Sequence, residues 1–591
     1  MTHLQITILS QRHTAMMITN NRPFDNNHFI GYVKQVTPEY VMAHIPASRL
    51  LSLYHYGGER HHPGIVGTFI AIEGEEFGFV GRILELSLSE NERLNLTERS
   101  FEKEEFHPVA KIEILISFNY FEKGQINKGL DTFPHIGAKV FSCTAGFLQQ
   151  YLLQFGKNSL ATSSIEFNLG VLASDQTVSV TVEPQSLFGR HCAVVGTTGG
   201  GKSWTVAKLV EEVLVNKGKA ILLDATGEYR TFVATGVQSV IIGENSYLHY
   251  SQLGISDLFY LLRPSDKVQR PKLMEAIRSL KMVKLNGGAN ITMHTGGPAI
   301  KVEDGLLKKE GCDKLTLNRY YHKNIGQIET DDLDFDIKKL PLQIVKECIW
   351  DTDRNNSSIY GGLNESDLSF CTSLISRLNN LVNTSNFQSV FGFDKPIADA
   401  TDLIGIIEAF LSDPKAHILR ISLEEIGYDF QVREILANAI GRCLLKKART
   451  GQFKTSKSLI VFIDEAHQFM NKTVQDEYSP VQQLDAFELI AKESRKFGLF
   501  LCLATQMPRD IPQGTLSQMG TFIVHRLINR HDKDAIENAC SSANRAVLSF
   551  LPTLGRGEAI LLGVDFPMPI AIRLNAPDLP PDSTTPPVIS A

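Results

Sequence analysis

The sequence predicts an α/β protein whose core is a mainly parallel sheet, with a β-barrel before the core and a helical insertion within it. Three observations predict this fold class. A glycine-rich loop at residues 196–203 lies between a short apolar strand pattern and a helical pattern. Later apolar runs have the length and continuity of strands that are buried on both faces. Alternating apolar and polar residues with turn signals fill much of the first third of the chain.

Length and composition indicate an ordinary globular protein of more than one domain. The chain has 591 residues, of which 43% are hydrophobic and 21% charged, and this length favours about two to four domains. The net charge of -6 is mild and does not by itself indicate a nucleic-acid binder. Basic residues confined to a narrow channel would not alter this total, so DNA remains a possible ligand.

Residues 1–185 are predicted to form a small β-barrel. Short alternating strand patterns with turn signals recur there, at residues 29–33, 66–72, 77–84 and 110–116. The α/β core is predicted to follow at residues 186–250 and to resume at residues 420–575.

The loop at residues 196–203 reads GTTGGGKS, which is a complete G-x-x-x-x-G-K-S motif. Its glycines allow backbone amides to turn towards phosphate oxygens, while Lys202 supplies a positive charge and Ser203 a hydroxyl ligand for magnesium. The strand pattern at residues 191–195 and the helical pattern that ends near Gly218 place a helix N-terminus against the anion. These flanks make a chance match of the motif improbable.

A second motif supplies two acids. The apolar run at residues 459–463 ends in Asp464 and Glu465. An aspartate at a buried strand end suits a magnesium ion, and the glutamate beside it suits a base that polarises the attacking water. The alternative is a pair of solvated acids at a sheet edge, but the run is too continuously apolar for an edge strand.

Residues 251–419 are predicted to be a helical insertion, because helical segments such as 273–282 and 368–382 alternate with polar loops there. The lysines and arginines of this region, such as Lys281 and Lys308, could contact phosphates, but a solvated charged face is the favoured interpretation. Strand patterns resume after the acids, at residues 500–504 and 521–524. The last residues, 576–591, contain five prolines and are predicted to be a flexible tail.

Two further candidates lie near the ends of core elements. Gln506 ends the strand after the acids, where its amide could contact both a γ-phosphate and the attacking water; a surface amide is the alternative. Arg495 and Lys496 close a helix before Gly498. Their residue types suit either the negative end of a helix dipole or contact with the γ-phosphate of a neighbouring subunit.

Two more candidates keep two interpretations each. Arg190 precedes the strand of the phosphate loop at the sheet end away from the phosphates, so a role in a neighbouring subunit's site and a structural ion pair are both open. Asp224 ends the strand at residues 220–224, and Glu228 lies in the turn that follows it. Either acid could assist magnesium or water, or cap the following turn.

Taken together, these motifs resemble the HerA family, DNA translocases of the FtsK/HerA branch of RecA-like P-loop ATPases, and the bacterial anti-phage defence type in particular. The resemblance covers most of the chain, including the barrel. It rests on residues 190–191, 196–205, 224–229, 463–467, 494–498, 503–508, 516–518, 522–529 and 555–559.

The resemblance implies a role for each matched residue. Its nucleotide-binding positions are Gly196, Thr198, Gly199, Gly200, Gly201, Lys202, Ser203 and Trp204. Its metal-binding positions are Ser203 and Asp464. Its catalytic positions are Glu465, Asp464, Arg495 as the finger that reaches the adjacent site, Gln506 as the sensor, and Asp224 and Arg190 in or near the site.

The resemblance also implies ATP and magnesium as cofactors, a homo-hexameric ring, and double-stranded DNA in its channel. An effector enzyme is expected on the ring, either a NurA-like or other nuclease or a sirtuin-type NADase, in antiviral defence. Two alternatives to a DNA translocase remain: a ring scaffold that uses ATP to switch an effector, and a protein remodeller or secretion ATPase.

The expected location is the cytoplasm, without a membrane partner. The eight cysteines are scattered without a C-x-x-C pair, and several lie in apolar runs, as reduced core thiols do. The first residues lack the pattern of a signal peptide, and no apolar stretch approaches the length of a membrane span.

Overall fold

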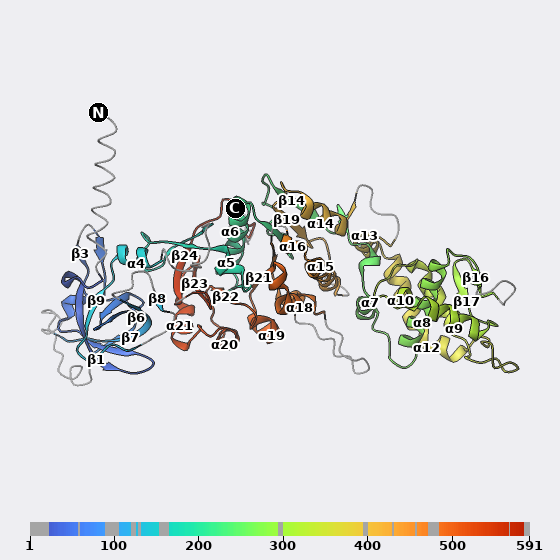
Figure 1. Cartoon of the computed structure of the whole chain (residues 1–591), viewed down its shortest axis with the longest axis horizontal. Coiled ribbons are helices and arrows are strands. Elements are labelled where there is room, and N and C mark those ends of the chain that lie inside the picture. Colours follow the sequence, from blue (N-terminus) through green and yellow to red (C-terminus); the bar gives the residue numbers. More distant parts are fainter. Residues whose placement is uncertain are drawn as a thin grey trace, which may run out of the picture. The chain divides into compact units, whose positions relative to one another are not determined.

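The computed structural model describes residues 23–56, 59–88, 106–119, 126–127, 132–152, 165–292, 299–393, 400–427, 431–455, 458–470, 484–566 and 568–583. The chain divides into two compact units (Figure 1). One consists of residues 1–216 and 500–581, and the other of residues 217–499 and 582–591.

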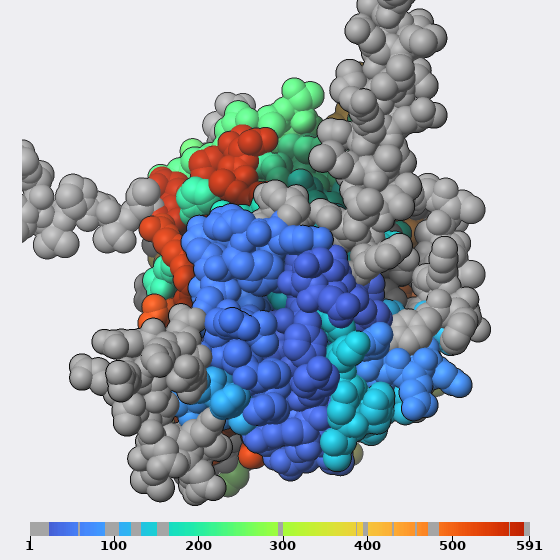
Figure 2. All heavy atoms as spheres, turned by 90° about the vertical axis from the view of Figure 1, so that its left-hand side faces the viewer, coloured from blue at the N-terminus to red at the C-terminus, as the bar shows by residue number. Residues whose placement is uncertain are grey.

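The first unit begins with the predicted β-barrel. Its antiparallel strands follow the order β2-β1-β9-β5-β6-β7-β8, and β7 also pairs with β2, which closes the sheet on itself. Alternate side chains, such as Ile30, Val41 and Phe79, fill the interior of the barrel. Figure 2 shows its outer surface in blue. The strands are β1 (Phe29–Val36), β2 (Val41–His44), β5 (Phe69–Glu73), β6 (Phe77–Ser87), β7 (Val109–Asn119), β8 (Ile126–Asn127) and β9 (Lys139–Ser142), with the separate hairpin β3 (Tyr54–Tyr56) and β4 (Glu59–His61).

The same unit contains a mixed sheet in which the strand of the phosphate loop, β12, lies between two parallel neighbours, β21 and β22. Antiparallel strands extend this sheet beyond β22, in the order β22-β23-β24-β10-β11. The strands are β10 (Phe167–Leu172), β11 (Ser179–Val182), β12 (Cys192–Val195), β21 (Leu499–Thr505), β22 (Thr521–Val524), β23 (Glu558–Gly563) and β24 (Ile570–Leu574). Although β10 and β11 lie within the range assigned to the barrel, they pair with the strands of this sheet because β24 offers β10 an antiparallel edge.

A buried contact joins the barrel to the C-terminal part of this unit. Glu113 of β7 pairs with Arg82 of β6 at 2.7 Å and accepts a hydrogen bond from Asn544 at 2.6 Å. The Arg82 guanidinium lies 4.9 Å from the ring centre of Phe550. The helices of the unit are α4 (Ala145–Leu152), α5 (Pro184–Phe188), α6 (Lys202–Val215), α19 (Gln513–Leu516), α20 (Arg530–Ala539) and α21 (Arg545–Phe550).

The second unit contains parallel strands in the order β20-β13-β19-β14. Their bounds are β13 (Lys219–Asp224), β14 (Val237–Ile241), β19 (Ile418–Ser422) and β20 (Leu459–Ile463). All five strands predicted for the core, including β12, β21 and β22, are therefore confirmed within a few residues, as is the α/β fold class.

Between β14 and β19 the second unit is helical, as predicted, and the segments expected at residues 273–282 and 368–382 lie within α8 and α12 (Figure 1). Asn364 caps α12 by accepting hydrogen bonds from the amides of Ser366 and Asp367. The helices here are α7 (Ile255–Leu262), α8 (Gln269–Leu285), α9 (Lys314–Lys323), α10 (Ile325–Ile328), α11 (Leu340–Glu347), α12 (Glu365–Asn383), α13 (Ser385–Phe391) and α14 (Leu403–Ser412), with the short pairs β15 (Ser246–Tyr247) and β18 (Thr401–Asp402), and β16 (Lys301–Glu303) and β17 (Leu306–Lys308). The later helices are α15 (Val432–Arg449), α16 (Gln452–Thr455), α17 (His467–Met470), α18 (Ala486–Glu493) and the 3-10 helix η6 (Ser494–Phe497).

The tail predicted at residues 576–591 is described as far as residue 583, and that part makes specific contacts. The amide of Asp578 donates to a carboxylate oxygen of Glu211 at 2.6 Å. The amide of Asp582 donates to the carbonyl of Glu228 at 2.7 Å. Among the residues that the structure describes, no helix is both long and apolar enough to cross a membrane.

Candidate nucleotide-binding and hydrolysis site

The loop after β12 has the backbone of a phosphate-binding loop. Gly199 and Gly201 have φ angles of 75° and 113°, which residues with side chains rarely adopt. Gly201 is the N-cap of α6 and has no side chain that could cap this helix end. Uncapped amides at the positive end of a helix dipole favour an anion. Lys202 begins α6 with only 5% of its surface exposed, so its charge lies at the same helix end.

The remaining predicted nucleotide-binding residues lie around this loop. Ser203 is partly buried in the first turn of α6, while Trp204 is 37% exposed. The hydroxyl of Thr198 donates a hydrogen bond to the side-chain oxygen of Gln506. This contact forms because β12 and β21 are parallel neighbours, with Val195 opposite Thr505. The structure therefore brings the predicted sensor, Gln506, onto the phosphate loop.

Arg190 lies at the other end of β12. Its Nε atom is 3.2 Å from a carboxylate oxygen of Asp565, and half of its side chain is exposed. Of the two interpretations that the sequence left open, the ion pair is the contact observed within this chain.

The two acids follow β20 in the second unit. Asp464 is 1% exposed and Glu465 5%. The amide of Asp464 donates to the carbonyl of Leu223 at 3.2 Å, which fixes the acids at the carboxyl end of the parallel strands. Glu465 has a φ of 48°, a left-handed conformation that costs a non-glycine residue about 1–3 kcal/mol and is frequent at functional sites. Its Oε2 atom lies 3.3 Å from Nδ1 of His467.

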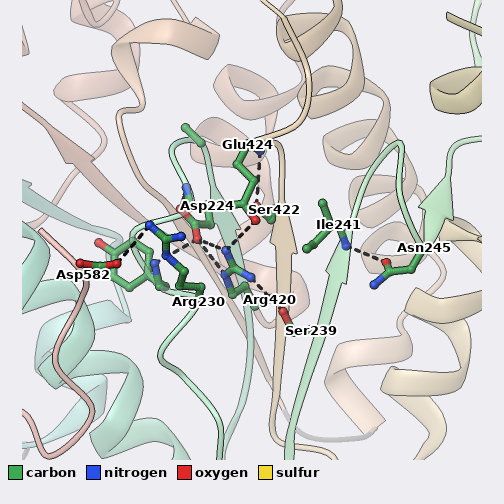
Figure 3. Close-up of polar contacts among 12 residues, drawn as sticks. Asp224, Arg230, Ser239, Ile241, Asn245, Arg420, Ser422, Glu424 and Asp582 are labelled. Carbon is green, nitrogen blue, oxygen red and sulfur yellow. Dashed lines mark hydrogen bonds and ion pairs between the residues drawn. The ribbon is translucent and has the colours of Figure 1, made fainter. Parts of the chain in front are cut away.

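Asp224 shows the contacts of a turn cap (Figure 3). Its Oδ1 atom accepts the amide of Gly227 at 2.8 Å, and Oδ2 accepts the amide of Tyr229 at 3.1 Å. Two guanidinium nitrogens of Arg420 lie 2.7 Å from Oδ2, and a third donates to the Ser239 hydroxyl at 3.0 Å. The carboxylate thus organises the turn at residues 224–229.

This turn places Tyr229 near the acidic pair. Tyr229 is fully buried. Burial, together with the charges of Asp464, Asp224 and Glu228, raises the pKa of the Tyr229 hydroxyl well above its ordinary value. The hydroxyl therefore keeps its proton and provides a donor close to Asp464.

Arg495 lies in η6, a 3-10 helix that ends at Gly498 with a φ of 79°. Its side chain is exposed, and no ion pair includes it in the described part of the chain. The predicted termination by Gly498 is confirmed, and the basic side chain is available to an external partner.

Two residues that contact predicted site residues or their elements, one in each unit, were not identified from the sequence. Arg420 interrupts the apolar run of β19, and an arginine there is a signal of a buried acidic partner. His525 directly follows β22, and it lies against the phosphate loop because β22 is the parallel neighbour of β12. Strand order in a sheet is set by long-range pairing, so neither partner could be named from sequence patterns.

Comparison with known proteins identifies the family. Residues 167–378 match the model of the central domain of helicase HerA, and residues 450–587 match that of the HerA-like C-terminal domain. The chain belongs to the HerA family. Together with the complete phosphate loop, this makes it an ATP-hydrolysing P-loop enzyme.

Several individual proteins are similar to this HerA-family chain. A probable helicase of Methanocaldococcus jannaschii is 22% identical over 567 residues, which cover 93% of this chain and 91% of that protein. The DNA double-strand break repair helicase HerA of Pyrococcus furiosus is 22% identical over 411 residues, 69% of each protein. Among solved structures, VirB4 of Thermoanaerobacter pseudethanolicus aligns with a TM-score of 0.44 and 14% identity over 71% of this chain and 98% of that one.

Proposed function

We propose that this protein is a homo-hexameric ATPase that moves along double-stranded DNA. The observation that carries the proposal is the loop between β12 and α6, with left-handed glycines, a helix N-terminus whose N-cap is glycine, and the buried Lys202. The family supports DNA as the track, because related proteins are named as helicases and as a DNA double-strand break repair helicase.

The residues present fit MgATP. The amides of Gly199 and Gly201 and the charge of Lys202 would hold the phosphates, with Trp204 beside them and Gly200 in the turn of the loop, and Ser203 and Asp464 would ligate magnesium. Magnesium, when bound, would neutralise phosphate charge and help to orient the triphosphate.

The chain's own groups would then assist water in its attack on the γ-phosphorus. Glu465 would accept the water proton while the bond to the bridging oxygen breaks, which yields ADP and phosphate. Gln506 would contact the γ-phosphate, and Arg495 of a neighbouring subunit would stabilise the developing charge. Asp224 would hold the turn at residues 224–229 in place. Arg190 would fix the start of β12 through its ion pair with Asp565.

Hydrolysis is tested by Glu465→Gln. Because Glu465 would polarise water without holding the nucleotide, ATP binding should persist while turnover falls about 10²- to 10⁴-fold. Direct binding of ATP and release of phosphate measure the two effects. Unchanged turnover would remove Glu465 from the mechanism.

The ring is tested by mixing two inactive variants. A subunit with Arg495→Ala keeps an intact phosphate loop, and a subunit with Lys202→Ala keeps an intact Arg495. Mixed rings would therefore contain some complete sites and recover part of the ATPase activity. No recovery at any ratio, when both variants are shown to co-assemble, would contradict a shared site.

DNA translocation is tested by the ATPase rate and by displacement of a third strand from a linear duplex. Added duplex should raise the rate, and displacement should require hydrolysis. A rate that rises only with a partner protein would instead favour a ring scaffold that switches an effector, or a protein remodeller.

We further propose that the ring works with an effector enzyme in anti-phage defence, docked at the barrel end within residues 1–185. Isolation of the native complex, followed by assays of nuclease and NADase activity, identifies the effector class. A native ring that carries neither activity would contradict this part of the proposal.

A further inference from the structure

His525 forms the support beneath the phosphate loop. Its imidazole is fully buried, and its backbone amide donates to the carbonyl of Val195, the last residue of β12, at 2.7 Å. The next residue, Arg526, accepts the amide of Thr197 through its carbonyl at 3.1 Å. The segment after β22 is thus hydrogen-bonded to the beginning of the loop.

The side chain of His525 fits closely against two glycines of the loop. A Cβ atom on Gly196 would lie 2.6 Å from Cβ of His525, and one on Gly201 would lie 3.3 Å from Cε1 of its imidazole. The first distance is a clash and the second is a tight contact. The Cβ atom of residue 525 therefore excludes a side chain at position 196, and the imidazole itself limits the space at position 201.

The hydrogen bonds of the His525 imidazole show which of its nitrogens carries the proton. Nδ1 lies 2.9 Å from the carbonyl oxygen of Glu558, which only accepts, so Nδ1 carries a proton. Nε2 lies 2.7 Å from the hydroxyl oxygen of Thr205. Burial, with a contribution from the charge of Lys202, lowers the pKa of His525 to about 4. The ring is therefore neutral near pH 7, and Nε2 accepts the proton of Thr205.

Thr205 connects this hydrogen bond to the first turn of α6. Its hydroxyl also lies 3.1 Å from the carbonyl of Gly201, but the shorter contact is with His525. Because Thr205 follows Lys202 and Ser203 on α6, this bond restrains the helix end that carries them. Glu558, at the other end of the imidazole, begins β23, whose preceding residue Gly557 donates to the carbonyl of Gly200 at 3.4 Å.

We propose that His525 is a positioning residue for ATP binding, which holds the phosphate loop and the start of α6 in their binding geometry through Thr205 and Glu558. It touches no reacting atom. The inference rests on the proposed function, because it assumes that this loop binds ATP.

A double-mutant cycle tests the bond between His525 and Thr205. In His525→Asn, the amide can still donate to the Glu558 carbonyl but nothing reaches Thr205, and Thr205→Val removes the hydroxyl at nearly constant shape. Each change should raise the dissociation constant of a fluorescent ATP analogue with magnesium about tenfold. The double variant should bind about as weakly as either single variant, because both changes remove the same bond.

Controls separate positioning from general damage. Thr205→Ser keeps the hydroxyl and should restore wild-type affinity, and His531→Asn changes an exposed histidine of α20 and should have no effect. The melting temperature of Thr205→Val without nucleotide should stay close to that of the wild type, and KM for ATP should rise more than kcat falls.

The outcomes distinguish this inference from the proposed function. Wild-type protein that binds no nucleotide would overturn both. If the wild type binds and the folded single variants bind equally well, or if their effects multiply in the double variant, only the role of His525 is overturned. Should His525→Asn fail to fold, the contrast between Thr205→Val and Thr205→Ser still decides.

Discussion

The loop after β12 and the turn after β13 both follow buried parallel strands, but they are built in opposite ways. In the first, left-handed glycines and the N-terminus of α6 give a backbone that suits an external anion, and a neutral imidazole packs against the loop. In the second, the amides of the turn donate to the carboxylate of Asp224, and Arg420 neutralises the charge of that carboxylate (Figure 3). A loop that receives a ligand offers hydrogen-bond donors to that ligand, whereas in a turn with a purely structural role the donors are bonded within the chain.

The largest effect is expected from Arg420→Met. Arg420 is 2% exposed and Asp224 is fully buried, so the change leaves a buried carboxylate without its countercharge. Loss of one partner of a buried ion pair costs about 3–5 kcal/mol. Denaturant unfolding without nucleotide measures the loss of stability.

The double variant Arg420→Met with Asp224→Asn is the matched control. Asparagine keeps an oxygen for the turn amides but carries no charge, so part of the stability should return. A loss below about 1 kcal/mol in the single variant would contradict the assigned role of the pair.

Lys202→Ala should show the reverse pattern, with binding lost and stability retained. A charge-assisted hydrogen bond contributes about 1.5–3 kcal/mol, so the dissociation constant of ATP should rise about 10- to 100-fold. The free energy of unfolding without nucleotide should not fall, because the change removes a buried charge. Titration calorimetry and denaturant unfolding measure the two quantities.

Lys208→Ala on the same helix is the control for α6 itself. Lys208 pairs with Glu211 and Glu212 at 2.8 and 3.0 Å, away from the loop, and its removal should leave ATP affinity unchanged. Equal losses of affinity in both variants would mean that the helix, rather than the loop charge, had been damaged.

The neutral support of the phosphate loop predicts a pH dependence of stability. The pKa of His525 is lowered to about 4 in the folded protein, against about 6.5 in an unfolded chain. Below pH 6.5 the unfolded state binds a proton that the folded state does not, so stability falls as the pH falls towards 4. From pH 6.5 to pH 5 this contribution is about 2 kcal/mol.

Comparison with His525→Asn isolates this contribution, since asparagine does not titrate. Unfolding at pH 7.5 and at pH 5 should show a steeper loss in the wild type than in the variant. Parallel losses would show that the imidazole takes up its proton in the folded state, and the hydrogen-bond assignment would then fail.

Sequence patterns predicted the strands, the loop and the helix end around these two regions, but not the side-chain partners that hold them. The strands around Val195 and Asp224, the glycine loop and the termination at Gly498 all depend on local patterns, and the structure confirms them. The partners of Asp224 and Thr205 lie 196 and 320 residues away along the chain. Such pairs arise from strand order, which is decided by packing of the whole sheet. The pairing of β10 with β24 has the same origin. For that reason β10 and β11, which the sequence patterns assigned to the barrel, belong to the mixed sheet that contains β12.

The smallest effect is expected from Arg230→Ala, on the same turn as Asp224. Arg230 pairs with Asp582 at 3.0 Å, but its side chain is 65% exposed, and exposed ion pairs contribute about 0.2–1 kcal/mol and weaken in salt. Unfolding at low and high salt should therefore show a loss well below that of Arg420→Met, and a smaller one in high salt. A loss as large as that of Arg420→Met would show that the segment around Asp582, rather than the buried pair, holds the turn in place.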